Sequence, residues 1–592
     1  MTWENMGSDE QARPSRALAG AVAGVLAAAA AIGAAQFASG LGVPQSSPVL
    51  AVGQAAIDLT PPAVKDFAIS AFGANDKTVL LGGILVVVAL YAAVVGMLAV
   101  RRLAFGVWGL AIFAAIGLAA ALTRPAATVG YVVPTLVGAA AGAFALTWLA
   151  RAAAGLGSRL DALYPFDLHP ELTDPPPPGA PAQPGAPAQP AGPAWRPGAG
   201  RPPGPADIAE PAVLRAGPAY NTFTLAHPDD QAPSRWPARR RFLISSGAAA
   251  AVAALGTGAG RNLANEHNIA AARTAIRFPR PAVPAPPVPP GSDLNIPGLA
   301  SFITPDGSFY RVDTALLVPQ VDPAAWRLRI HGMVRRGITI TFADLLRRPL
   351  IEAYVTLTCV SDPVGGPYAG NAKWLGASLA ALIRQAGPLA GANQLLCTSI
   401  DGYTSGTPLP AVLDGRNALL AVAMNGTALP IVHGFPARMV VPGLYGYVSA
   451  TKWVTDIEVT TFAAARAYWA QRGWAQQAPI KTESRIDVPT AGAPLRPGRT
   501  PVAGVAWAQH KGIAAVEVRV NGGPWHEARL AAVPGIDTWR QWVWEWQAAP
   551  GNYLLEARAT DATGYTQTAV QADPVPNGAS GYPSVQVTVR GS

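Results

Sequence analysis

Long apolar runs dominate the first quarter of the chain. Each is about as long as the twenty residues that a helix needs to cross a bilayer. The four runs are residues 17–38, 79–100, 103–122 and 127–150. They predict an all-α transmembrane bundle of four spans within residues 1–151.

Arginines flank these runs on what would be one side of a membrane. Arg13 and Arg16 precede the first run, Arg101 and Arg102 join the second to the third, and Arg151 follows the fourth. Cytoplasmic loops of membrane proteins carry the excess of Lys and Arg. The pattern therefore predicts that both ends of the four-span bundle are cytoplasmic. No histidine lies within these runs, so we interpret the bundle as an anchor or docking unit and do not expect a haem held by two histidines inside it.

A Pro/Gly/Ala-rich segment over residues 152–238 cannot build a core and is expected to be an extended cytoplasmic linker. Residues 239–261 then combine an Arg-Arg-x-Phe-Leu pattern with a modestly apolar run. This pattern matches a twin-arginine export signal. The alternative is a fifth span flanked by arginines, and either interpretation takes the chain out of the cytoplasm.

Residues 262–294 contain the proline-rich run PRPAVPAPPVPP. Because polyproline segments are extended and stiff, we expect a stalk that holds the next domain about 35–40 Å from the bilayer.

In the rest of the chain the apolar runs are shorter and alternate with polar residues. Residues 295–475 mix strand-like alternation with two helix-like stretches, which predicts an α+β domain. Residues 483–592 hold several alternating runs separated by turn residues, which predicts an immunoglobulin-like β-sandwich.

Composition narrows the possible partners. Only 13% of the residues are charged and the net charge is +9. The cations lie largely where a membrane protein needs them, and no basic stripe with interleaved aromatic residues occurs, so we expect no nucleic acid partner.

Cys359 is one of two cysteines in the chain and follows a β-branched run that leads into the loop TCVSDPVGG. The residues by themselves leave three interpretations open. It could be a buried small hydrophobe, a disulfide partner of Cys397, or a soft metal ligand. The later runs HGFPAR and SATKW bring a His, an Arg and a Lys that would suit an anionic, phosphate-bearing cofactor.

Several ordered motifs between residue 304 and the C-terminus together resemble the molybdopterin domain of the sulfite oxidase family. They are TPDGSFYRVDTA (304–315), TCVSDPVGG, GNAKWLG (370–376), DGYT (401–404), HGFPAR and SATKW. The resemblance implies that Cys359 binds molybdenum and that His433, Arg438 and Lys452 hold the pterin and its phosphate.

The resemblance also implies roles for four further residues. Gly365 and Gly366 would let the loop after the cysteine approach the cofactor, and Asn371 matches the family's GNAxW turn. Arg311 aligns with an arginine that attracts an oxyanion substrate beside the metal.

The chain also departs from the family pattern. Pro363 and Val364 replace a pair of arginines, Asp362 stands where Asn is common, and Val312 and Asp313 replace an Asn-His pair. A site that loses cations and gains carboxylates is less suited to a dianion such as sulfite.

We therefore expect a membrane-anchored, extracytoplasmic molybdopterin-dependent oxidoreductase that moves an oxygen atom and two electrons to or from a small substrate. No haem-binding motif occurs, so electrons should pass through a separate carrier, either a cytochrome or a quinone-linked partner. The resemblance also implies a homodimer made by the C-terminal domain. Two alternatives remain: a cofactor-free scaffold protein, and a thiol enzyme that uses Cys359 with His433.

Overall fold

The computed structural model describes residues 7–41, 46–61, 64, 76–123, 129–154, 238–266 and 269–591. Most of the predicted linker, residues 152–238, lies outside the described residues.

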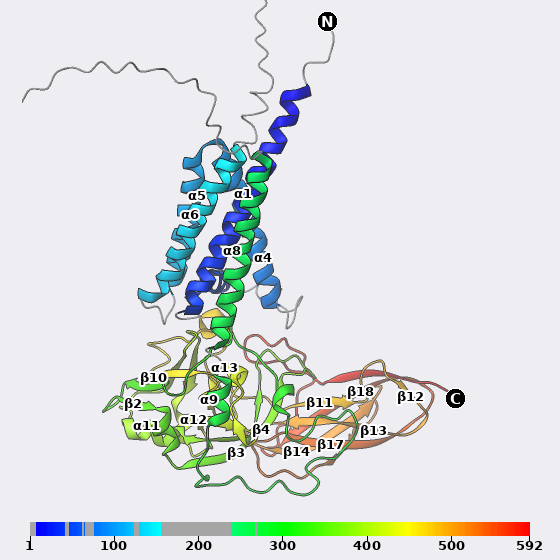
Figure 1. Ribbon diagram of the computed structural model, residues 1–592. Helices are drawn as coiled ribbons and strands as arrows, with labels where there is room; N and C mark the ends of the chain where they lie inside the picture. The colour runs from blue at the N-terminus through cyan, green and yellow to red at the C-terminus, as the bar shows by residue number, and fades with distance from the viewer. Residues whose placement is uncertain are drawn as a thin grey trace, which may run out of the picture.

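The N-terminal region is helical (Figure 1). Its elements are α1 (Gly7–Leu41), α2 (Pro48–Leu59), α4 (Asp76–Arg101), α5 (Leu103–Leu122), η3 (Val129–Val132), α6 (Val133–Ala154) and α8 (Ala238–Glu266). Five stretches are long and apolar enough to cross a membrane, at residues 17–41, 79–101, 103–122, 130–153 and 242–260. They coincide with the four predicted runs and the fifth apolar segment, so the expected series of apolar helices is confirmed.

Glycines join α8 to α1. A Cβ at Gly33 would come within 2.8 Å of the Ala253 backbone, and one at Gly256 would come within 2.7 Å of the Gly33 backbone. Further along the two helices, the backbones at Gly40 in α1 and Gly260 in α8 approach each other about as closely. Apolar helices pack this tightly only where small residues let their backbones meet. The fifth apolar helix is thus a packed member of the bundle.

A part rich in short strands lies beyond the bundle. Its strands are β1 (Arg327–Gly332), β2 (Ile338–Thr341), β3 (Leu350–Thr358), β4 (Ala369–Ser378), β5 (Gln394–Ser399), β6 (Thr404–Pro408), β7 (Leu419–Met424), β8 (Thr427–Ala428), β9 (Arg438–Val440) and β10 (Val454–Thr460). One sheet has the order β2-β1-β10-β5-β6, and the other has the order β3-β4-β7-β8 with β9 paired to β7. Only the β1–β10 pair in these two sheets is parallel.

Short helices α9 (Ala270–Ala275), α10 (Phe342–Leu346), α11 (Leu379–Ala386), α12 (Leu409–Leu413) and α13 (Gly446–Ser449) accompany these sheets. Their ends follow from the sequence. Thr341 and Asp344 form a capping box at the start of α10. Ser378 caps α11, which ends at Gly387 with a φ of 72°, a left-handed position that favours glycine. The mixed α and β content of this part agrees with the expectation.

The proline-rich segment differs from the expected stalk. The backbone N–H of Ala282 donates to the Leu350 carbonyl at 2.8 Å, and the N–H of Glu352 donates to the Val283 carbonyl at 2.9 Å. The segment therefore lies along the edge of β3. An edge strand presents unpaired backbone N–H and C=O groups. The few non-proline residues of the segment supply the backbone groups that pair with them. The strand-rich part consequently begins close to the end of α8 (Figure 1).

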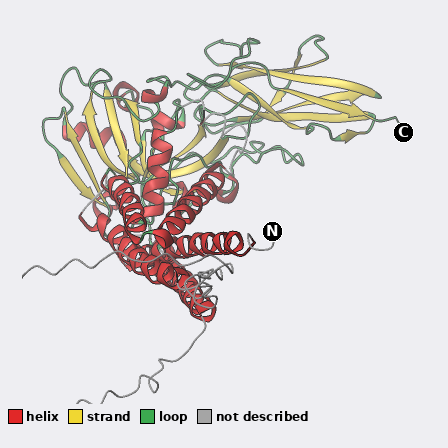
Figure 2. Cartoon of the chain, turned by 90° about the horizontal axis from the view of Figure 1, so that it is seen from above, coloured by secondary structure: helices red, strands yellow, loops and turns green. Residues whose placement is uncertain are grey.

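Two further sheets form the C-terminal part, which extends to one side (Figure 2). Their strands are β11 (Glu483–Val488), β12 (Pro494–Leu495), β13 (Gly498–Trp507), β14 (Ile513–Val520), β15 (His526–Glu527), β16 (Arg529–Leu530), β17 (Arg540–Ala548), β18 (Gly551–Asp561) and β19 (Ser584–Val589). The orders are β11-β13-β17-β16 and β12-β19-β18-β14-β15. One hydrophobic core contains residues from both sheets, including Trp542 and Trp546.

Trp539 belongs to a different core. It is 1% exposed, packs among residues of the mixed part, and donates its Nε1–H to the Phe302 carbonyl at 2.9 Å. This contact ties the two parts together.

The α1–α8 seam generates a prediction. Gly256→Leu should destabilise the bundle by about 1–3 kcal/mol, because the new side chain has no room against the α1 backbone. Thermal unfolding of the detergent-solubilised chain would measure the effect. Gly258→Leu is the matched control, since a Cβ at Gly258 meets nothing within 4 Å. Equal stability of the two variants would contradict the packing of α8 in the bundle.

Candidate active site

Cys359 lies immediately after β3, at the start of the loop that was singled out in the sequence. Its side chain is 9% exposed and its Sγ lies 3.0 Å from the Ser361 Oγ. Burial raises the pKa of the thiol, while hydrogen bonds from Ser361 oppose that rise. Cys359 and Cys397 are both free, so the disulfide interpretation is wrong. This also removes the disulfide that a cofactor-free scaffold would have gained.

The two loop glycines have a steric role. A Cβ at Gly366 would come within 2.7 Å of the Pro363 Cδ and would collide with the Asp362 carboxylate. Gly365 has a φ of 74°, in the left-handed region. The same Asp362 carboxylate accepts the backbone N–H of Tyr368 at 2.9 Å. The loop after Cys359 is therefore a tight turn braced by a buried carboxyl group.

Arg438 is a buried cation without a carboxylate partner among the residues that the structure describes. Its guanidinium donates to the carbonyls of His433 at 3.0 Å and Ala450 at 3.2 Å, and it lies 5.1 Å from the centre of the Trp374 ring. Burial lowers the pKa of Arg438 to about 10. A buried charge is costly unless it is paired, so this position suits an anionic ligand.

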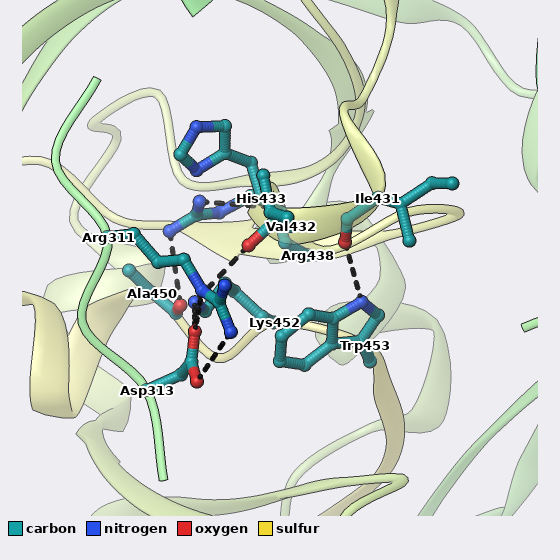
Figure 3. A network of polar contacts seen from close by, with 9 residues as sticks. All are labelled: Arg311, Asp313, Ile431, Val432, His433, Arg438, Ala450, Lys452 and Trp453. Atoms are coloured by element: carbon teal, nitrogen blue, oxygen red, sulfur yellow. Dashed lines mark hydrogen bonds and ion pairs between the residues drawn. The ribbon is translucent and has the colours of Figure 1, made fainter. Parts of the chain in front are cut away.

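Lys452 and Arg311 meet at one carboxylate, that of Asp313 (Figure 3). The Lys452 Nζ lies 2.7 Å and the Arg311 Nε lies 2.8 Å from the Asp313 Oδ2. Burial lowers the pKa of Lys452 to about 8, against the opposing effect of Asp313. The positive charge of Lys452 also lowers the pKa of Cys359. Arg311, Lys452 and Cys359 therefore share one electrostatic environment.

His433 is 3% exposed, and its Nε2 lies 3.2 Å from the Asp306 carbonyl. Burial, assisted by the charge of Arg438, lowers the pKa of His433 to about 4. The imidazole is therefore neutral at pH 7 and donates its Nε2–H to that carbonyl. The sulfur of Cys359 contacts Ser361, whereas His433 contacts Asp306, so these contacts do not form the nucleophile–base pair that a thiol enzyme needs.

Asn371 lies in a strand and not in the turn that the resemblance implies, and its role toward the cofactor stays a prediction. It is fully buried in β4, where it accepts from the Thr356 hydroxyl at 3.1 Å and donates to the Phe302 carbonyl at 2.8 Å. Its backbone N–H donates to the Thr304 hydroxyl at 3.1 Å. The structure uses Asn371 to hold the 302–304 segment against the sheet.

Two tyrosines beside Cys359 were missed as site residues, although both lie within the quoted motifs. Burial raises the pKa of Tyr310 and of Tyr403, and charge on Cys359 would raise both further. The Tyr403 hydroxyl donates to the Tyr447 carbonyl at 2.7 Å. The available signal was their place in these motifs, with Tyr310 directly before Arg311 and Tyr403 two positions after Asp401.

Comparison with known proteins shows the family. A family model described as "Oxidoreductase molybdopterin binding domain" matches residues 315–469. Sulfite oxidase of Gallus gallus is 31% identical over 290 residues, which are 41% of this chain and 62% of that protein. The uncharacterized oxidoreductase YuiH of Bacillus subtilis is 31% identical over 153 residues, which are 26% of this chain and 74% of that protein. This chain belongs to the sulfite oxidase family of molybdopterin-binding oxidoreductases.

The family's cofactor is molybdopterin with its molybdenum. The chain spans only about three fifths of the chicken sulfite oxidase that it matches. The sulfane dehydrogenase SoxCD of Paracoccus pantotrophus is a solved structure with 25% identity over 45% of this chain and 75% of that chain. Its TM-score of 0.41 does not by itself establish a shared fold.

The donor set of this chain fits the cofactor. A buried guanidinium that lacks a carboxylate partner and a buried ammonium suit a phosphate-bearing group, and a nearby thiol suits a soft metal. The guanidinium belongs to Arg438, the ammonium to Lys452 and the thiol to Cys359.

Two neighbouring buried carboxyl groups, Asp362 in the cysteine loop and Glu483 in β11, generate a pH prediction. Burial raises the pKa of Asp362 to about 6 and, together with the neighbouring Asp362, that of Glu483 to about 8. The folded chain therefore keeps a proton on Glu483 that the unfolded chain loses above about pH 4.5. Stability should fall as the pH rises from about 5 to 8, by at most about 1.4 kcal/mol per pH unit from this group.

Glu483→Gln should flatten this dependence, as measured by urea unfolding of the full chain followed by tryptophan fluorescence at pH 6 and pH 8. Glu545→Gln is the control, because the Glu545 side chain is 44% exposed. An unchanged pH dependence in Glu483→Gln would contradict the buried, protonated carboxyl.

Proposed function

We propose that this chain is a membrane-anchored molybdopterin-dependent oxidoreductase whose molybdenum is held by Cys359 and which transfers an oxygen atom and two electrons to or from a small substrate. The observation that carries the proposal is the buried Arg438 guanidinium, which has no carboxylate partner among the described residues and lies in the same network as Lys452. When bound, the cofactor supplies the redox chemistry, and the protein supplies binding and electrostatics.

Each side chain then has a defined task. Arg438 presents a planar set of donors to the cofactor's phosphate, and Lys452 adds a point charge. The neutral His433 ring beside them offers hydrogen bonds without adding positive charge. Lys452 also favours the thiolate form of Cys359, which is the form that binds a metal.

The loop and the exposed arginine complete the site. Gly365 and Gly366 keep the turn after Cys359 compact, so that backbone can approach the cofactor. The side chain of Arg311 is 39% exposed, and we place it at the mouth of the site, facing the substrate.

The proposed anchor contacts the strand-rich part close to the site. A Cβ at Gly53 in α2 would come within 2.9 Å of the Leu316 side chain, and Leu316 follows the loop that carries Arg311 and Asp313. This contact supports a catalytic part that sits against the end of the helices, outside the cytoplasm, on a multi-pass anchor.

We assign residues 1–151 and 239–261 to the anchor, residues 295–475 to the molybdopterin-binding unit and residues 483–592 to an immunoglobulin-like sandwich that makes a homodimer. A separate carrier, a cytochrome or a quinone-linked membrane protein, exchanges electrons with the site.

Replacement of the proposed ligand tests this function. Cys359→Ser should lower the bound molybdenum and the oxidoreductase activity at least tenfold while the chain stays folded, because a hydroxyl is a much harder donor than a thiolate. Metal analysis of the purified full chain, with circular dichroism for folding, would measure it. Cys397→Ala is the matched control, since Cys397 lies in β5 with its Sγ directed to the Leu395 carbonyl. A full molybdenum content in Cys359→Ser would refute the proposed ligand.

Export can be tested separately. Replacing Arg239 and Arg240 with lysines should block passage of the catalytic part through the membrane, because a twin-arginine signal is read as arginines by its receptor. Protease added outside right-side-out vesicles would measure exposure of residues 269–591. The control is the Arg101→Lys, Arg102→Lys pair, which keeps the charge between two spans. Unchanged exposure would show that residues 239–261 are a simple fifth span.

A further inference from the structure

The carboxylate of Asp313 is contacted by both Arg311 and Lys452 in the network that Figure 3 shows. We propose that Asp313 is a built-in counter-anion for Arg311 and that it restricts the site to neutral oxygen-atom donors or acceptors, such as S-oxides, N-oxides or their reduced forms. This inference rests on the proposed function and names its substrate class.

The geometry shows a buried carboxylate shared by two cations. The Arg311 Nε and the Lys452 Nζ both approach the same oxygen, Oδ2, at 2.8 and 2.7 Å. The Arg311 Nη2 reaches the other oxygen at 3.4 Å. The Asp313 side chain is only 4% exposed, compared with 39% for Arg311. The carboxylate therefore lies beneath the arginine, in a position where charge pairing is little screened by water.

No positive charge of this network is left over to bind a dianionic substrate. Three cations act on His433, namely Arg438, Lys452 and Arg311. Arg438 and Lys452 are assigned to the cofactor's phosphate, and Asp313 neutralises Arg311. The His433 ring is uncharged at pH 7, and the buried Asp401 adds a further carboxyl group coupled to Asp313 and Lys452.

A dianionic substrate would have to bind against this balance. Moving a charged group into a poorly solvated site is costly without an unpaired cation. A neutral oxide carries no charge, so its binding avoids this cost. Its oxygen can accept a hydrogen bond from the Nη1 side of Arg311, which the pair with Asp313 does not use.

The corresponding reaction needs two electrons, which an external carrier supplies. A sulfoxide R₂SO takes up two electrons and two protons, its S–O bond breaks, and the products are R₂S and water. A one-electron carrier supplies the two electrons in succession. Oxidation of the reduced substrate is the reverse of this step.

Sulfate is a suitable probe because it is a dianion that does not react. Asp313→Asn keeps the shape of the side chain and removes its charge, so the freed Arg311 should bind sulfate at least about tenfold tighter, equivalent to about 1.4 kcal/mol. Isothermal titration calorimetry on the molybdenum-loaded full chain would measure this without turnover. The Michaelis constant for sulfite should fall in the same variant.

Two further variants separate this effect from a structural change. In Arg311→Met, Asp313→Asn the gain in sulfate affinity should disappear, because the freed cation is gone. Asp414→Asn is the matched control, since Asp414 also pairs with an arginine two positions away, Arg416, at 2.7 Å. It should bind sulfate as the native chain does.

Each outcome decides the proposal. Sulfate affinity that is equal in Asp313→Asn and the native chain would overturn the counter-anion role, as would a gain that survives the loss of Arg311. If the native chain carries molybdenum but binds sulfate as tightly as Asp313→Asn, the counter-anion role and the substrate class are both refuted, and the proposed function stands. A chain that carries no molybdenum refutes the proposed function and the substrate class with it.

Discussion

The site depends on a guanidinium that is buried without a carboxylate partner among the described residues. Carbonyl groups of His433 and Ala450 hold Arg438 in place, and the Trp374 ring lies against it, but none of these groups neutralises its charge. A buried charge of this kind is costly unless an anion pairs with it. In the proposed function that anion is the cofactor's phosphate, and its position sets that of the metal relative to Cys359.

The path from the apolar helices to the site is short and is held by contacts at several points. After α8, which packs against α1 through glycines, Arg273 in α9 donates to the carbonyls of Ala428 and Leu429, just before the HGFPAR run. The proline-rich segment then pairs with β3, the strand that ends at Cys359. The segment that follows the last apolar helix is thus attached to the edge of the sheet that carries the proposed metal ligand.

Electrostatic balance gives the site its individual character within the family. The motifs that resemble the family contain the thiol, the buried arginine and the lysine. Carboxyl groups stand near them in this chain, with Asp313 paired to two cations, Asp362 buried within the cysteine loop and Glu483 buried next to Asp362. In our proposal these carboxyl groups leave the cofactor's contacts unchanged and limit the charge that a substrate can carry into the site.

The sequence by itself determined the elements and the family. Apolar runs of bilayer length, short-period alternation and the ordered motifs around Cys359 are local patterns, and local patterns persist in any fold. Only the tertiary structure decided the free state of both cysteines, the docking of the proline-rich segment on β3, the inward turn of Asn371 and the meeting of Arg311, Asp313 and Lys452. These depend on contacts between residues far apart in the chain, such as the 139 positions between Asp313 and Lys452, and no local pattern records which distant groups will share a buried charge.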